Sequence, residues 1–135
     1  MISMKGALVC AFTTFATMAQ AVEVYECDLG SRGNDGMISQ VLVLLLDREK
    51  STGAAYDGMI HAVHGDPIPV NLKIRNNKTA LFNWKLQGVP LDDSSTGLAT
   101  YNAALNLQTL RVNVRAVLHG WENNTHGSGK CKLAK

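Results

Sequence analysis

The sequence predicts an all-β protein: a small antiparallel up-and-down β-barrel of about eight strands, closed by a disulfide between its first and last strands. Three observations support this prediction. Apolar and polar residues alternate with a period of two over short segments, and turn-forming residues separate these segments. One cysteine lies near each end of the predicted mature chain. A two-sheet β-sandwich is the alternative that this pattern allows.

The first 21 residues have the pattern of a signal peptide. Lys5 supplies a positive charge, an apolar run follows over 6–18, and Ala19-Gln20-Ala21 offers the small residues that signal peptidase reads. The run is too short to span a bilayer comfortably, so we expect no transmembrane segment in the mature chain. We expect 1–21 to be removed, 22–135 to form a single β domain, and the protein to be exported, either periplasmic or secreted.

The cysteines indicate one disulfide. Cys10 lies in the signal peptide, which leaves Cys27 and Cys131, an even count of the kind found in exported proteins. Their bond would close a loop of about 100 residues and stabilise the fold by up to about 4–5 kcal/mol. A zinc site needs four ligands and a redox motif needs a C-x-x-C spacing, and neither is present around these two residues.

Eight segments are expected to form strands. Asn76-Asn77 predicts a tight hairpin, and Asp57-Gly58 predicts a break or a bulge in the third segment. No amphipathic helix is expected. In a meander closed into a barrel the first and last strands are neighbours, which removes both exposed edges. The expected strands are 22–29, 37–47, 54–63, 68–75, 78–86, 98–107, 110–118 and 130–133.

Charge and spacing argue against several functions. Without Lys5 the chain has 12 basic and 11 acidic residues, and this near-neutral, scattered charge argues against nucleic-acid and polybasic membrane binding. His61, His64 and Asp66 form the motif H-A-V-H-G-D, and His119 is a further candidate metal ligand. On a strand, positions three apart point to opposite faces, so surface histidines are expected, with no metal and no cofactor. A metal-dependent or hydrolytic enzyme using these residues is the alternative.

Aromatic residues divide into core and loop. Most are expected to fill the barrel: Tyr25, Tyr56, Phe82, Trp84 and Tyr101. Trp121 instead lies in a predicted loop, 120–129, together with Glu122, Asn123 and Asn124. We expect Trp121 to form a lid over one barrel end, with an exposed anchor for a partner as the alternative.

These observations favour a non-enzymatic exported protein that binds a protein partner or a small apolar ligand at one barrel end, through the loop of Trp121. A structural envelope role is a further alternative. It depends on the apolar run 41–46, because only one of its two faces can point into the barrel.

The arrangement of Tyr25-Glu26-Cys27 near the mature start and Cys131 near the end resembles the small periplasmic β-barrel lysozyme inhibitors. The resemblance covers only the two termini. The S-G-x-x-Y motif of that family's central loop is absent, since 93–97 reads DSSTG. No functional residue is carried over from it.

Overall fold

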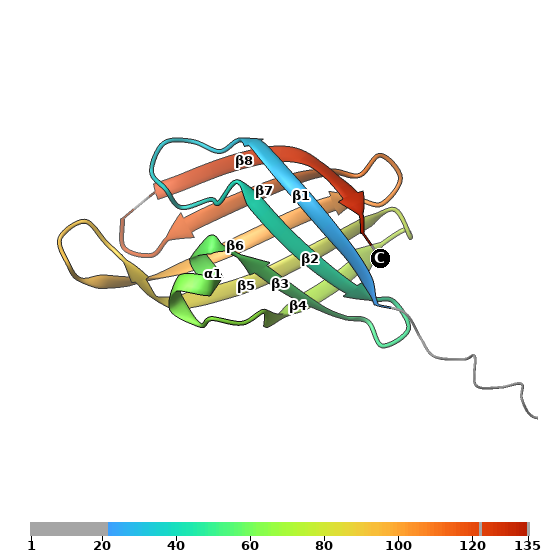
Figure 1. Cartoon of the computed structure of the whole chain (residues 1–135), viewed down its shortest axis with the longest axis horizontal. Helices are drawn as coiled ribbons and strands as arrows, with labels where there is room; N and C mark the ends of the chain where they lie inside the picture. The colour runs from blue at the N-terminus through green and yellow to red at the C-terminus, as the bar shows by residue number, and fades with distance from the viewer. Residues whose placement is uncertain (1–21, 122, 135) are drawn as a thin grey trace, which may run out of the picture.

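The computed structural model describes residues 22–121 and 123–134. Eight antiparallel strands follow one another around a closed barrel, each paired with its neighbours in the sequence, and β1 pairs with β8 (Figure 1). The predicted fold class is therefore confirmed. The strands are β1 Glu23–Ser31, β2 Val41–Asp47, β3 Thr52–Asp57, β4 Ile68–Arg75, β5 Thr79–Pro90, β6 Thr96–Asn106, β7 Arg111–Leu118 and β8 Asn123–Leu133, and one helix, α1 Gly58–Val63, follows β3.

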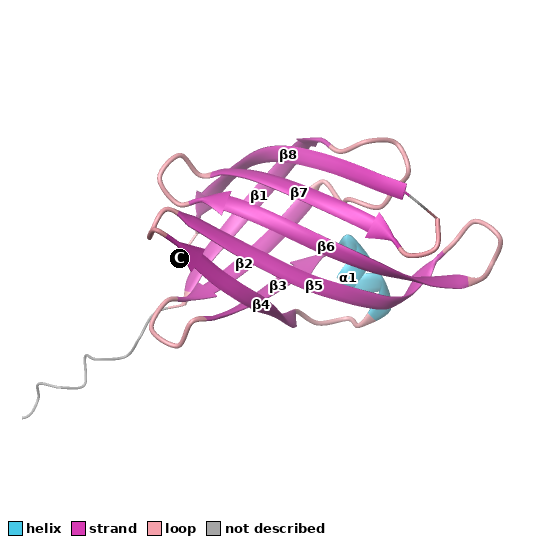
Figure 2. Cartoon of the chain, turned by 180° about the vertical axis from the view of Figure 1, so that it is seen from behind, coloured by secondary structure: helices cyan, strands magenta, loops and turns pink. Residues whose placement is uncertain are grey.

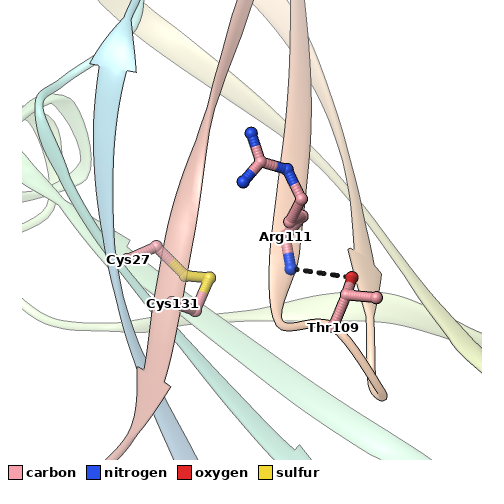
Figure 3. Close-up of a disulfide and its surroundings, with 4 residues drawn as sticks. All are labelled: Cys27, Thr109, Arg111 and Cys131. Carbon is pink, nitrogen blue, oxygen red and sulfur yellow. Dashed lines mark hydrogen bonds between the residues drawn. A yellow bond between two sulfur atoms is a disulfide. The ribbon is translucent and has the colours of Figure 1, made fainter.

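The disulfide joins the two strands that close the barrel. Cys27 and Cys131 are direct partners in the antiparallel register of β1 and β8, and their Cα atoms lie 3.8 Å apart (Figure 3). A separation above about 7 Å would have excluded the bond. The predicted pairing is confirmed, and the bond spans 104 residues of sequence.

The barrel interior is filled by the inward residues of every strand. Phe82, Trp84 and Tyr101 are buried, and the rings of Trp84 and Tyr101 stack with centroids 5.4 Å apart. Leu42, Leu44 and Leu46 face inward from β2 and are at most 1% exposed, which settles the orientation of the apolar run 41–46. Tyr56, which was expected in the core, points the other way from β3 and is only partly buried.

The predicted strand 54–63 is broken at Gly58, and its second half is not a strand but helix α1. Asp57 caps the helix, and its carboxylate accepts a hydrogen bond of 2.8 Å from the Ile60 N–H. Asp followed by Gly was interpreted as a bulge, yet Asp is equally a preferred N-cap residue. The helix has only six residues, too few to show a 3.6-residue period in the sequence.

Strand β8 is longer than predicted because its glycines mark close packing, not a loop. A Cβ atom on Gly129 would lie 1.9 Å from the carbonyl oxygen of Asp28, and one on Gly127 would lie 2.9 Å from that of Ser31. Glycine is needed where β8 lies this close to the irregular part of β1. The segment predicted as the loop 120–129 therefore lies mostly in β8. Strands β5 and β6 also extend further than expected and leave only 91–95 between them.

The two longest connections of the barrel, 32–40 and 58–67, lie at the same end. This end, called the helical end below, holds α1 and the β1–β2, β5–β6 and β7–β8 connections, and lies at the left of Figure 1. The short turns of β2–β3, β4–β5 and β6–β7 lie at the opposite end, as the view from behind also shows (Figure 2). No helix among the described residues is long and apolar enough to cross a bilayer.

Candidate binding site at the helical end

A hollow of about 250 Å³ opens at the helical end, between three connections of the barrel. Trp121 stands at its rim and is 56% exposed. Its apolar lining includes buried Met37 and Leu118 and half-buried Leu91. A large aromatic side chain exposed beside an apolar concavity is the arrangement typical of a binding anchor. The complete lining is Asp35, Met37, Pro90, Leu91, Asp92, Asp93, Leu118 and Trp121.

Three carboxylates give the same hollow a negative rim. The Asp93 carboxylate accepts hydrogen bonds from the hydroxyl and the backbone N–H of Ser95, and these bonds lower the pKa of Asp93, so it is ionised at neutral pH. Asp35 accepts from the backbone N–H of Met37 at 3.1 Å and from the Thr125 hydroxyl. Asp92 is exposed beside them. The site therefore combines an apolar floor with a surplus of negative charge.

The connections around the hollow are held by hydrogen bonds. The Tyr101 hydroxyl, buried in the barrel, donates to the backbone oxygen of Met37 at 2.7 Å and fixes the β1–β2 connection. The Leu91 N–H donates to the Ser95 oxygen at 2.9 Å and closes the β5–β6 turn. Burial raises the pKa of Tyr101 well above its usual range, so the phenol remains a donor. A site fixed in this way loses little entropy on binding.

The residues predicted to form a binding loop do not stay together. Trp121 lines the hollow at the helical end and is 56% exposed, a position that favours the exposed anchor over the expected lid. Asn123 and Asn124 belong to strand β8, and Asn124 accepts a hydrogen bond from Arg115 on the outer face of the barrel. Glu122 lies outside the described residues. No sequence signal marks Asp35, Asp92 and Asp93 as neighbours of Trp121, because barrel closure alone brings these connections together.

The histidines lie on separate parts of the surface. His61 lies in α1 and His64 is its C-cap, so the expectation that His61 lies on the strand 54–63 is wrong. Tyr56 hydrogen-bonds the His61 ring, and His119, after β7, hydrogen-bonds Thr100 at 2.6 Å. Within residues 22–121 and 123–134, no group of three or more His, Cys, Asp or Glu residues is placed to hold a metal ion. Asp66 is exposed in the turn before β4. The metal-dependent alternative therefore finds no such group in this part of the chain.

The outward face of the apolar run on β2 is partly exposed. Val41 is 57% exposed, and Val43 and Leu45 are half-buried. Their cross-strand neighbours Val24 and Tyr56 extend this face onto β1 and β3. The requirement of the structural alternative, that one face of 41–46 reaches solvent, is therefore met at Val41.

Searches against protein-family models, curated proteins and solved structures find no significant match to this chain.

Proposed function

We propose that this protein is an exported, non-enzymatic binding protein that takes a side chain of a partner protein into the hollow at its helical end. The observation that carries the proposal is Trp121, which is 56% exposed on the rim of an apolar hollow. Tryptophan is one of the three residue types enriched among the anchors of protein interfaces. The disulfide across the barrel seam is compatible with an exported protein.

The size of the hollow favours a protein partner over a small apolar ligand. Small-molecule sites usually enclose about 300–1,000 Å³ and bury most of the ligand. The hollow offers about 250 Å³ and is open to solvent, while the barrel interior is filled by core side chains. A hollow of this size can hold one side chain of a partner protein, with the rest of the interface formed around it.

The charge of the rim favours a basic partner. Asp35, Asp92 and Asp93 would attract a Lys or Arg group, while Trp121 and Leu91 would cover its aliphatic stem. A cation beside an indole ring gains about 0.5–2 kcal/mol, depending on how far water is excluded. Carboxylates on the rim also speed up the encounter with a positively charged surface.

The test is capture of a partner from an envelope extract of the source organism on immobilised protein, with variants measured against the purified partner. Trp121→Ala should weaken binding by about 2 kcal/mol or more, about 30-fold. The double change Asp92→Asn, Asp93→Asn should weaken it and reduce its salt dependence. Leu133→Ala is the matched control, since Leu133 is 54% exposed at the opposite end. A partner that binds Trp121→Ala as tightly as the wild type would refute the proposal.

A structural role in envelope assembly is the second candidate, favoured by the exposure of Val41. It predicts self-association or attachment through β2, which Val41→Asp would abolish and Trp121→Ala would not. The molar mass in solution, measured by light scattering over a range of concentrations, distinguishes the two candidates.

A further inference from the structure

Charge is segregated around the barrel, contrary to the scattered distribution expected from the sequence. Strands β1–β3 carry five acidic residues and no Lys or Arg: Glu23, Glu26, Asp28, Asp47 and Asp57. Strands β4–β8 carry seven basic residues and no Asp or Glu: Lys73, Arg75, Lys85, Arg111, Arg115, Lys130 and Lys132. Lys132 lies 3.7 Å from Glu26 across the β1–β8 seam. On the other side of the barrel, every charged residue of the strands is a Lys or an Arg.

The register of these strands aligns polar side chains in one row across the basic side. Asn71 pairs with Asn83, Asn83 with Asn102, Asn102 with Arg115, and Arg115 with His126. We call these five residues the polar row. All five are on the outward positions of their strands, and none is buried. Because neighbouring strands lie about 4.8 Å apart, the row is about 19 Å long.

The row borders a hollow of about 480 Å³ on the outer face of β5–β8. Asn83, Asn102, Arg115 and His126 all line it. The next row across the same strands contributes Leu81 and Ala104, which give the hollow an apolar part, and Ser128 adds a hydroxyl. The hollow therefore combines an apolar part with polar groups from both rows.

Two contacts orient the polar groups before any ligand binds. Arg115 Nε donates to Asn124 Oδ1 at 3.0 Å, which turns the guanidinium and leaves its terminal nitrogens without a partner among the described residues. Asn83 Nδ2 donates to Asn102 Oδ1 at 2.5 Å. This bond leaves the Asn83 oxygen as an acceptor and the Asn102 nitrogen as a donor. Side by side they offer one donor and one acceptor, which is the complement of a pair of sugar hydroxyls.

We infer that the outer face of β4–β8 binds an acidic polysaccharide along the polar row. The amides pair with hydroxyl groups, Arg115 forms a bidentate pair with a carboxylate, and Lys85 and Arg111 supply further positive charge on either side. A row of this length contacts several sugar units. This surface is separate from the hollow at Trp121, so the inference does not depend on the proposed function.

The chemistry of the face favours a glycan over other polyanions. Single-stranded nucleic acid is held by stacking on aromatic side chains, and the aromatic residues of β5 and β6, Phe82, Trp84 and Tyr101, point into the barrel. A lipid surface binds exposed apolar residues that can insert into it, whereas the polar row consists of Asn, Arg and His. Three of the five residues of the polar row are neutral amides, which can bind sugar hydroxyls. A site that recognised only negative charge would not need them.

The test is isothermal titration of the mature protein with an oligogalacturonate of defined length, a carboxylated sugar chain. The controls are a neutral malto-oligosaccharide of the same length and a single-stranded DNA oligonucleotide of the same charge. The oligogalacturonate should bind, its affinity should fall with added salt, and both controls should bind at least about tenfold more weakly. Arg115→Gln should weaken binding about tenfold or more, and Asn102→Ala about three- to tenfold.

Lys50→Gln is the matched control, since Lys50 is an exposed cation in the β2–β3 turn, away from the row. It should change the affinity by less than about twofold. Absence of binding, an unchanged affinity of Arg115→Gln, or equal binding of the DNA or the neutral sugar would each overturn the inference. Trp121→Ala should bind the oligogalacturonate like the wild type, because the two sites are on different surfaces.

Discussion

Removing the disulfide tests how far barrel closure depends on a covalent link. The change is Cys27→Ala together with Cys131→Ala, because a single substitution would leave an unpaired thiol in the core, where both residues are at most 5% exposed. The bond spans 104 residues, and the chain-entropy model gives about 4.7 kcal/mol for such a loop. Measured values are commonly about 2–4 kcal/mol, which is a large part of the 5–15 kcal/mol that stabilises a typical domain.

The assay is urea unfolding, followed by far-UV circular dichroism and by the fluorescence of buried Trp84. The free energy of unfolding should fall by about 2–4 kcal/mol, and the m-value should rise because the unfolded chain is less compact without the bond. The control is the wild type unfolded in a reducing agent, which breaks the disulfide but keeps both cysteine side chains. It separates the effect of the bond from the effect of the side-chain volume lost in the alanine variant. A loss below about 1 kcal/mol with an unchanged m-value would refute the reasoning, since the β1–β8 hydrogen bonds would then close the barrel unaided.

Two further changes test the helix cap and the barrel seam. Burial raises the pKa of the Asp57 carboxyl above 3.8, so its ionisation costs stability as the pH rises through that raised pKa. Asp57→Asn keeps the acceptor for the Ile60 N–H, so the stability of this variant relative to the wild type should increase between about pH 3 and 7. Asp57→Ala removes the acceptor and should lower the free energy of unfolding by about 1–2 kcal/mol. Thermal melts of the variants and the wild type across this pH range test the prediction. A stability difference between Asp57→Asn and the wild type that does not change with pH would contradict it. Gly129→Ala should cost about 1–3 kcal/mol or more in urea unfolding, because its Cβ would meet the Asp28 oxygen. In Gly30→Ala the new Cβ would meet nothing within 4 Å, so its free energy of unfolding should stay within about 0.5 kcal/mol of the wild type. Equal losses for the two variants would contradict the close approach of β1 and β8 at Gly129.

The fold could be predicted because the strongest signals in the sequence are local and agree with one another. The alternation over β4 and β5 and the Asn76-Asn77 turn define a hairpin without any knowledge of the rest, and Asn76 and Asn77 both adopt positive φ angles. The pairing of Cys27 with Cys131 follows from the cysteine count once the signal peptide is set aside. The assignment of 1–21 to that peptide lies outside the described residues and stays a prediction.

The errors come from residues whose role depends on distant partners. Gly127 and Gly129 have the composition of a loop, yet they are glycines because β1 lies against them, which no local pattern shows. Asp57-Gly58 begins a helix too short to have a detectable period. The carboxylates beside Trp121 and the polar row of β4–β8 both depend on strand register. The residue types were visible in the sequence, but their arrangement in space was not.

The central claim is that the hollow at Trp121 takes a group that is both apolar and positively charged. The most direct measurement is an NMR titration with benzamidinium at millimolar concentration, with uncharged benzamide as the matched control. We predict that benzamidinium shifts the Trp121 indole N–H signal and the backbone signals of Asp35 and Asp93, and leaves the buried Trp84 indole unchanged. Benzamide should have a much smaller effect. Equal shifts with both compounds, or shifts that leave Trp121 unaffected, would contradict the claim.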